Sequence, residues 1–232
     1  MAAPLSRRKL LAASRGLAAS GLLLAQTGSV MAAWLTPTPA QPAGPFYHPF
    51  EPLSVDNDLL LRKDDAARAD GEIIYVKGRV RDQSGRPIRG ARVEIWQANA
   101  YGRYNHPRHA NSNLPLDPNF HGFGHSLTDE GGNYLFRSIK PAPYPDNADW
   151  LRPPHIHFAV FPPGGPAWTT QMYFAGESLN QSDFLLRSLK DDTARRRLIT
   201  RFRSYPDAPD PGASLGQFDI VLGMPGVVQD KA

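Results

Sequence analysis

Apolar and polar residues alternate along several short stretches of the chain, as expected of strands that bury one face. The longest such stretch covers residues 73–81, and residues 82–87 supply the Asp, Ser, Gly and Pro typical of turns. A second apolar stretch, residues 91–97, comes shortly after. We therefore expect these two strands to form a hairpin.

Further stretches of the same character lie between segments rich in Gly and Pro, of which the chain has 20 and 23. Six or more short strands separated in this way are typical of two packed sheets. The predicted fold is all-β: a β-sandwich of mainly antiparallel strands with long loops and one or two short helices. The additional strands are expected at residues 133–137, 155–161, 169–174 and 217–222.

One stretch has the periodicity of a helix. Ala194, Leu198 and Phe202 recur every four residues after the pair Asp191-Asp192, which can cap the first turn. We expect a helix here, with the three arginines at 195–197 on its solvated face.

The net charge of +4 comes from the N-terminus. Residues 1–33 contain four basic residues and no acidic one, so 22 of the 26 Lys and Arg remain in the rest of the chain, against 22 Asp and Glu. A chain that is neutral beyond residue 33 gives no support to nucleic-acid binding.

Residues 1–33 have the features of an export signal. Arg7 and Arg8 precede an apolar stretch around 21–25 and small residues around 30–32, an order that favours the twin-arginine route. We expect a periplasmic or extracellular protein, free of the membrane after signal removal. The alternative is a plain N-terminal extension or a membrane anchor, although the apolar stretch is shorter than the ~20 residues that span a bilayer. The expected order beyond it is a Pro/Ala linker at 34–43, a folded domain at 44–225 and a tail at 226–232.

The stretch 155–161 carries two histidines one residue apart. Because side chains of a strand alternate between faces, His155 and His157 share one face, opposite the apolar Ile156 and Phe158. Such a pair could chelate a metal or form ordinary hydrogen bonds. The chain has no cysteine, so any other ligand must be a carboxylate, a tyrosinate or another histidine.

Two tyrosines lie in unusual settings, Tyr104 after a Gly-Arg dipeptide and Tyr144 between two prolines. A tyrosine between prolines does not fit a central strand, so we expect a loop to display Tyr144. A phenol has an ordinary pKa of about 10, and only a strongly acidic metal such as Fe(III) would hold it ionised near neutrality. Packing in a loop is the alternative for each tyrosine.

The chain resembles the intradiol ring-cleavage dioxygenases, and among them the iron-binding (β) subunit of protocatechuate 3,4-dioxygenases. The resemblance runs from about residue 44 to residue 223. It is carried by GRVRDQSGRPIRGARVEIWQANAYGRY, PLDPNFHGFGHSLTDEGGNYLFRSIKPAPYP, RPPHIHF and QMYFAGE, all in order.

The resemblance implies a β-sandwich that binds non-haem Fe(III) and cleaves a catechol with O2 to a cis,cis-muconate. By the family pattern Tyr144 is the ligand that leaves and accepts a proton, Arg152 is the active-site cation, and Gln171 and Trp96 line the substrate site. Core packing is the alternative for Trp96. The positions that match the family's four iron ligands are Tyr104, Tyr144, His155 and His157.

The chain departs from the family pattern near the expected substrate site. Asp146 stands where protocatechuate enzymes usually carry tryptophan, and Leu151 is inserted before the arginine. His121 and His125 are also unexpected; they could line the entrance, form a second metal site or lie in solvent, and we expect solvent.

Protocatechuate, catechol and hydroxyquinol all remain candidate substrates. The chain lacks the long helical segment that builds the dimer of catechol 1,2-dioxygenases, so we expect a protocatechuate-type assembly, either a homo-oligomer or a complex with an α-type partner subunit. The alternative is a non-catalytic exported β-sandwich that binds a phenolic compound, a carbohydrate or a protein. A zinc or copper hydrolase is disfavoured because no carboxylate ligand or general base accompanies His155 and His157.

Overall fold

The computed structural model describes residues 34–47, 57–60, 68–147 and 149–223. The expected export signal at 1–33 and the tail at 226–232 lie outside these residues, and both stay predictions. Within the described part of the chain, no helix is long and apolar enough to cross a membrane.

The first sheet is built around β1 (Ile73–Arg81). Its partner on one side is the antiparallel β4 (Asn133–Ile139), and on the other it pairs in parallel with two short strands in succession. The remaining strands of this sheet are β10 (Phe202–Ser204), β11 (Ser214–Gln217) and β12 (Ile220–Val221).

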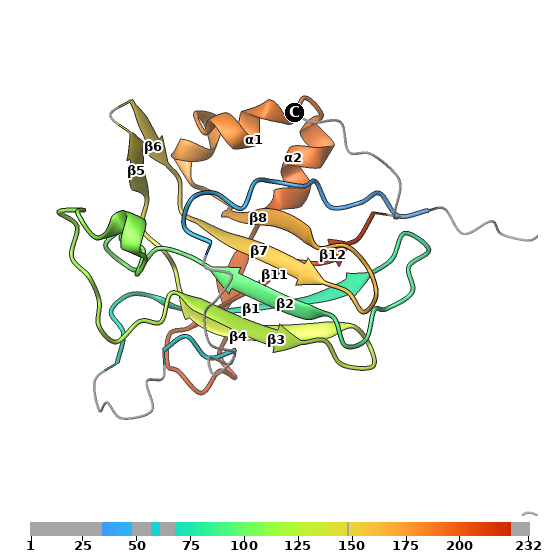
Figure 1. The fold of residues 1–232 in the computed structure, drawn as a ribbon. Helices are drawn as coiled ribbons and strands as arrows, with labels where there is room; N and C mark the ends of the chain where they lie inside the picture. The colour runs from blue at the N-terminus through green and yellow to red at the C-terminus, as the bar shows by residue number, and fades with distance from the viewer. Residues whose placement is uncertain (1–33, 48–56, 61–67, 148, 224–232) are drawn as a thin grey trace, which may run out of the picture. The chain divides into compact units, whose positions relative to one another are not determined.

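The second sheet has the order β3-β2-β7-β8-β9 and is antiparallel except for the last pair (Figure 1). Its strands are β3 (Phe123–Leu127), β2 (Arg92–Trp96), β7 (His155–Phe161), β8 (Trp168–Phe174) and β9 (Ile199–Thr200). A separate two-stranded ribbon is formed by β5 (Tyr144–Asn147) and β6 (Trp150–Arg152).

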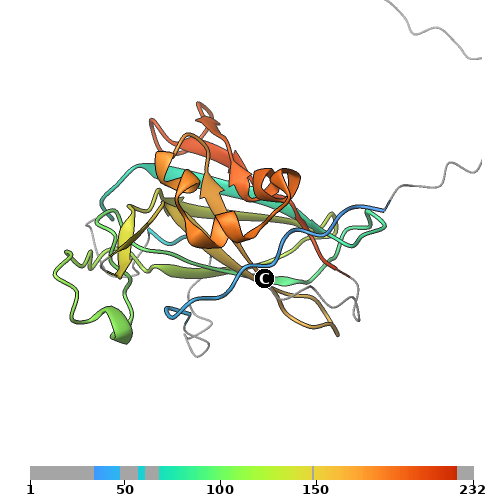
Figure 2. The same cartoon turned by 90° about the horizontal axis from the view of Figure 1, so that it is seen from above.

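Four short helical segments complete the described chain. Helix α2 contacts β8 and β9, and Figures 1 and 2 show α1 and α2 together beside β8. The segments are η1 (Pro107–His109), η2 (Ser178–Gln181), α1 (Phe184–Ser188) and α2 (Asp192–Leu198).

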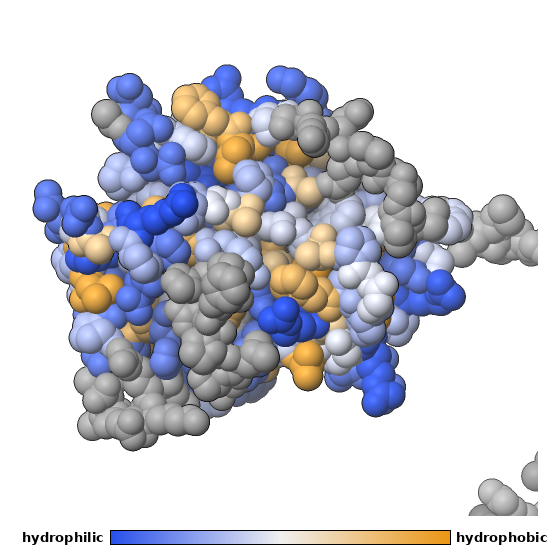
Figure 3. Space-filling view, in the orientation of Figure 1, coloured by the Kyte–Doolittle hydropathy of each residue, from blue (hydrophilic) through white to orange (hydrophobic). Residues whose placement is uncertain are grey.

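The core lies between the two sheets. Val76 and Phe136 from the first sheet join Ile95, Ile156 and Phe158 from the second in one fully buried cluster. The face of the molecule shown in Figure 3 is mostly hydrophilic over its described part, with apolar side chains in separate patches. The expected β-sandwich of mainly antiparallel strands with two short helices is therefore confirmed.

The Pro/Ala-rich stretch 34–43, expected to be a linker, is bonded to both sheets. The Thr38 amide donates to Val221, the Gln41 amide donates to Thr169, and the Thr170 hydroxyl donates to the Pro39 carbonyl oxygen. This stretch therefore lies against strands β8 and β12.

The predicted hairpin is wrong, although both of its strands exist. β1 pairs with β4, β11 and β12, whereas β2 pairs with β3 and β7 in the other sheet. Residues 82–87 do turn, with Gly85 at a positive φ of 86°, but the chain then crosses between the sheets. Alternation identifies a strand with one buried face and does not say which sheet contains it.

Two other predicted elements are shorter than expected. The helix begins after its Asp191 cap and ends at Leu198, because Ile199 and Thr200 pair with β8 and Phe202 belongs to β10. The strand expected at 217–222 is interrupted between β11 and β12.

Gly78 is the tightest point of the first sheet. A Cβ at this position would lie 1.9 Å from the Phe218 carbonyl oxygen and 2.6 Å from the Tyr134 hydroxyl. We expect Gly78→Ala to lower the melting temperature by at least about 4 °C, because the backbone must move to admit the methyl group. Lys77→Ala, at the exposed neighbouring position, should stay within about 2 °C. Equal melting temperatures for the two variants would contradict this packing.

Candidate metal centre

Strand β7 is buried on both of its faces. Ile156 and Phe158 point into the sandwich core, so His155 and His157 lie on the outer face of the second sheet, where they are also buried. Gly44, from the N-terminal segment, lies over His157, and its ideal Cβ position is 3.4 Å from the imidazole Cε1. The segment before β1 therefore covers the outer face at the histidines.

The two imidazoles face each other through their Nε2 atoms, which are 3.2 Å apart. Nδ1 of His155 lies 2.7 Å from the Pro153 carbonyl oxygen, so Nδ1 carries the proton and Nε2 presents a lone pair. Burial, followed by the Arg152 cation, holds the pKa of both histidines well below the ordinary value. Both rings are therefore neutral near pH 7, the form that binds metals.

Two phenols complete the cluster. Tyr104 follows β2 in a loop, and its ring centroid lies 5.2 Å from that of Tyr144 and 6.4 Å from that of His157. The Tyr144 ring lies 5.6 Å from His155. The structure therefore brings together the four side chains singled out in the sequence.

The expectation that a loop displays Tyr144 needs correction. Tyr144 is the first residue of β5 and lies opposite Arg152 of β6 in the two-stranded ribbon. Pro145 is tolerated there because the ribbon is separate from both main sheets.

The buried phenols are costly without a ligand. Among the described residues the Tyr104 hydroxyl makes no hydrogen bond of regular geometry, and burial, followed by the neighbouring Tyr144, raises its pKa well above the ordinary value. Burial also raises the pKa of Tyr144, while the positive charge of Arg152 acts in the opposite direction. A multiply charged cation would satisfy the orphaned Tyr104 oxygen and favour both phenolates.

The donor set fits a metal that accepts nitrogen and phenolate oxygen. No three His, Cys, Asp or Glu side chains come together in the described ranges, so a metal at this cluster depends on the tyrosines.

Arg152 lies beside the cluster, buried together with Gln171. Its Nη2 donates to the Gln171 Oε1 at 2.9 Å, and the Gln171 Nε2 donates to the Pro42 carbonyl oxygen at 2.9 Å. Gln171 is the cross-strand neighbour of His157, so the arginine is joined to the sheet that carries the histidines.

Trp96 packs against the histidine pair. Its ring stacks on the His157 ring, with centroids 4.9 Å apart and an interplanar angle of 9°. It also contacts the tilted Tyr47 ring, whose centroid lies 4.7 Å away. Trp96 therefore packs against the His157 imidazole and helps to fix its orientation.

Sequence reasoning missed two contributors. The Phe46 ring stacks on Tyr104 at 4.3 Å, and the His109 Nδ1 accepts a hydrogen bond from the Tyr104 amide at 3.0 Å. His109 is also 6.2 Å from the Tyr144 ring, centroid to centroid. The motif around Tyr104 contains no pattern that would identify either residue.

His121 and His125 lie outside the four-residue cluster. Both side chains are half-buried, so they are less exposed to solvent than expected. His125 is the cross-strand neighbour of Glu94, and the His121 amide donates to the Leu59 carbonyl oxygen. Neither residue belongs to the candidate metal centre.

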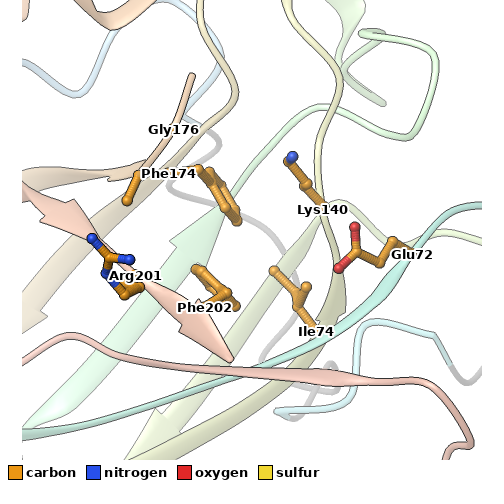
Figure 4. A pocket seen from close by; sticks show the side chains of 8 residues that line it. Glu72, Ile74, Lys140, Phe174, Gly176, Arg201 and Phe202 are labelled. Carbon is orange, nitrogen blue, oxygen red and sulfur yellow. The ribbon is translucent and has the colours of Figure 1, made fainter. Parts of the chain in front are cut away.

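A separate pocket of about 270 Å³ contains none of the cluster residues. In Figure 4 the rings of Phe174 and Phe202 lie between Arg201 on one side and Glu72 on the other. Its lysine, Lys140, pairs with Glu177 at 2.7 Å. This pocket is therefore separate from the candidate metal centre.

Known proteins of related sequence and structure are dioxygenases. The family profile described as "Dioxygenase" matches residues 43–224. The chain is 42% identical over 187 residues to the protocatechuate 3,4-dioxygenase beta chain of Burkholderia cepacia, covering 79% of this chain and 74% of that one. It is 31% identical over 200 residues to a catechol 1,2-dioxygenase of Pseudomonas sp. (strain EST1001), covering 81% and 62%. The 3-chlorocatechol 1,2-dioxygenase of Rhodococcus opacus 1CP superposes with a TM-score of 0.63 at 28% identity, covering 84% and 76%.

The fold and these matches together identify the family to which the chain belongs. The chain belongs to the intradiol dioxygenases, whose members use non-haem Fe(III). It spans less than two thirds of the Pseudomonas catechol 1,2-dioxygenase, and the relatives' names cover several different substrates.

Tyr104→Phe tests whether the buried phenol is there for a metal. In iron-free protein we expect an unchanged or higher melting temperature, because the variant removes a buried hydroxyl that makes no regular hydrogen bond within the described part of the chain. With Fe(III), we expect at least about tenfold weaker iron binding and a smaller rise in melting temperature than in the parent protein.

Tyr134→Phe is the matched control. Tyr134 is equally buried, but its hydroxyl donates to the Phe218 carbonyl oxygen. It should lower the melting temperature with and without iron and leave iron affinity unchanged. Parent-like iron affinity in Tyr104→Phe would remove this tyrosine from the site.

Proposed function

We propose that the protein is an Fe(III) intradiol dioxygenase that cleaves a catechol between its two hydroxyl-bearing carbons. One O2 is consumed for each ring opened, and both oxygen atoms enter the cis,cis-muconate product. The proposed ligands are Tyr104, Tyr144, His155 and His157. When bound, Fe(III) would hold the catecholate and make its ring susceptible to O2.

One observation carries the proposal: two neutral imidazoles and two buried phenols converge next to a buried arginine. The two histidines share strand β7, with their Nε2 atoms 3.2 Å apart, whereas Tyr104 comes from the loop after β2 and Tyr144 from β5. No disulfide or thiolate chemistry competes, since the chain has no cysteine. Imidazole nitrogens suit iron, and phenolate oxygens suit a strongly acidic ion such as Fe(III).

Tyr144 is the proposed proton acceptor. Its oxygen experiences the positive charge of Arg152, which favours phenolate against the effect of burial. The Tyr144 oxygen could then accept the proton that a catechol hydroxyl loses when the substrate binds. The site would thereby supply its own general base.

Arg152 and Gln171 are proposed to act on the substrate. The guanidinium is buried and fixed by hydrogen bonds, so its positive charge is preorganised for negative charge that develops on the ring and on the incoming oxygen. Gln171 is held from both ends of its amide, and Trp96 keeps the His157 ring in place.

The substrate is a catechol of the protocatechuate, catechol or hydroxyquinol type, and the proposed setting is outside the cytoplasm. Relatives carry the names of protocatechuate, catechol and hydroxyquinol dioxygenases. We include assembly with further copies or with an α-type subunit in the proposal, since one relative is a beta chain. The signal-like residues 1–33 support export.

Oxygen uptake by iron-loaded protein with protocatechuate, catechol and hydroxyquinol tests the function directly. We expect one O2 per ring opened and an ultraviolet-absorbing muconate with at least one of the three. His157→Ala should lose iron and activity together, because it removes one of two chelating nitrogens. Tyr144→Phe should keep part of its iron and lose at least about tenfold in kcat, because the proton acceptor is gone. Iron-loaded parent protein that consumes no O2 with any of the three would end the proposal.

Asp146 provides a test of substrate charge. It is exposed, two residues beyond Tyr144 in β5, and its negative charge raises the pKa of both Tyr104 and Tyr144. The same field should disfavour the carboxylate of protocatechuate. We expect Asp146→Asn to raise the ratio of kcat/KM for protocatechuate over catechol about two- to fivefold, the range of an exposed charge pair.

Asp149→Asn is the control for this prediction. Asp149 is exposed between β5 and β6 and is not among the main causes of the raised pKa of either phenol. Its ratio should remain that of the parent protein. An unchanged ratio in Asp146→Asn as well would show that Asp146 plays no part in substrate choice.

A further inference from the structure

The arginine beside the candidate metal centre has a buried partner that no motif indicates. The Asp183 Oδ2 lies 3.0 Å from the Arg152 Nε, and the two side chains are 0% and 3% exposed. Asp183 is the residue before α1 and lies 31 positions beyond Arg152 in the chain. Two charges buried so fully persist only when each neutralises the other.

Several contacts fix the arginine in one orientation. Nε binds Asp183, and Nη2 donates both to Gln171 at 2.9 Å and to the Tyr173 hydroxyl at 3.1 Å. The guanidinium carbon lies 5.0 Å from the centroid of the Trp150 ring. An arginine side chain has many rotamers, and these contacts select one.

Asp183 is itself held rigidly. Its Oδ1 accepts the Leu186 amide at 2.9 Å, which caps the first turn of α1, and lies 3.3 Å from the Tyr173 hydroxyl. The two carboxylate oxygens therefore have separate roles, because one anchors the residue to α1 and the other receives the arginine. Any shift of Asp183 would move the guanidinium.

The arginine in turn faces the phenols. Arg152 lies opposite Tyr144 in the β5–β6 ribbon, and its positive charge acts on the Tyr144 phenol. A guanidinium released from Asp183 could turn toward other acceptors. Its charge would then be misplaced relative to the oxygen where negative charge develops.

We propose that Asp183 is a positioning residue that fixes the Arg152 guanidinium in its working orientation through the buried ion pair and the α1 cap. In this proposal Asp183 acts on the reaction through Arg152, although its other carboxylate oxygen also lies 3.3 Å from the Tyr173 hydroxyl. The inference rests on the proposed function for its catalytic consequence, and the ion pair itself can be tested without activity.

The first test is Asp183→Asn in iron-loaded protein. Asparagine can still accept the Leu186 amide, so α1 keeps its cap while Arg152 loses its counter-charge. We expect kcat to fall about 10- to 100-fold with KM within about threefold, and with iron content unchanged. Parent-like kcat in folded, iron-loaded Asp183→Asn would overturn the proposal.

Asp191→Asn is the matched control. Asp191 caps α2 through the Thr193 and Ala194 amides but is exposed and pairs with no active-site residue. It should leave kcat unchanged. If Asp183→Asn does not fold, Asp183→Glu is the deciding variant, because it keeps the negative charge and displaces it by one methylene. We expect kcat to fall at least about tenfold, and a parent-like kcat would refute the positioning role.

A second test needs no activity. Melting temperatures are compared for Asp183→Asn, Arg152→Met and the double variant, all without iron. Each single variant should melt at least about 6 °C lower because it leaves a buried group unpaired, and the double variant should fall by less than the sum of the two shifts. Additive shifts would refute the ion pair even if the protein is an active dioxygenase. Coupled shifts in a protein that takes up no O2 would instead refute only the proposed function.

Discussion

The site depends on one constraint, that β7 is buried on both of its faces. The inner face supplies Ile156 and Phe158 to the core, which anchors the strand, and the outer face holds His155 and His157 away from water. Burial keeps these imidazoles neutral and, by the same mechanism, raises the cost of the phenols beside them. In a water-filled groove the same four side chains could hydrogen-bond to water, and metal binding would then relieve little desolvation cost. The low-dielectric setting makes a cation the natural partner of Tyr104 and Tyr144.

Electrostatic balance around that cluster follows from the same burial. Arg152 lowers the pKa of both histidines and opposes the effect of burial on both phenols, so a single cation acts on all four candidate ligands. Such a charge is tolerated only because Asp183 neutralises it. The arginine, the helix cap and the metal cluster are therefore parts of one electrostatic unit that crosses β6, β7, β8 and α1.

Much of this could be read from the sequence, and what could not was non-local. Alternation located β1 and β7 with the bounds that the structure gives, because strands with one or two buried faces leave a direct signal. The grouping of Tyr104 with the histidines came from resemblance to a family, since spacing alone left ordinary packing open. The hairpin was wrong because a turn does not determine sheet partners. Asp183 and Phe46 were missed because each meets the site only after a distant segment folds across it, and His109 was missed because no sequence pattern shows that its ring turns back to the Tyr104 amide five residues earlier.

The central claim is that two phenolates and two imidazoles bind one ferric ion in this buried cluster. The most direct measurement is the visible absorption spectrum of the protein after loading with one equivalent of Fe(III), together with the same spectrum for Tyr104→Phe and Tyr144→Phe. Tyrosinate-to-iron charge transfer predicts a burgundy protein whose visible band shifts or weakens in each variant. A colourless protein that retains stoichiometric iron, or a band unaffected by either substitution, would contradict the account.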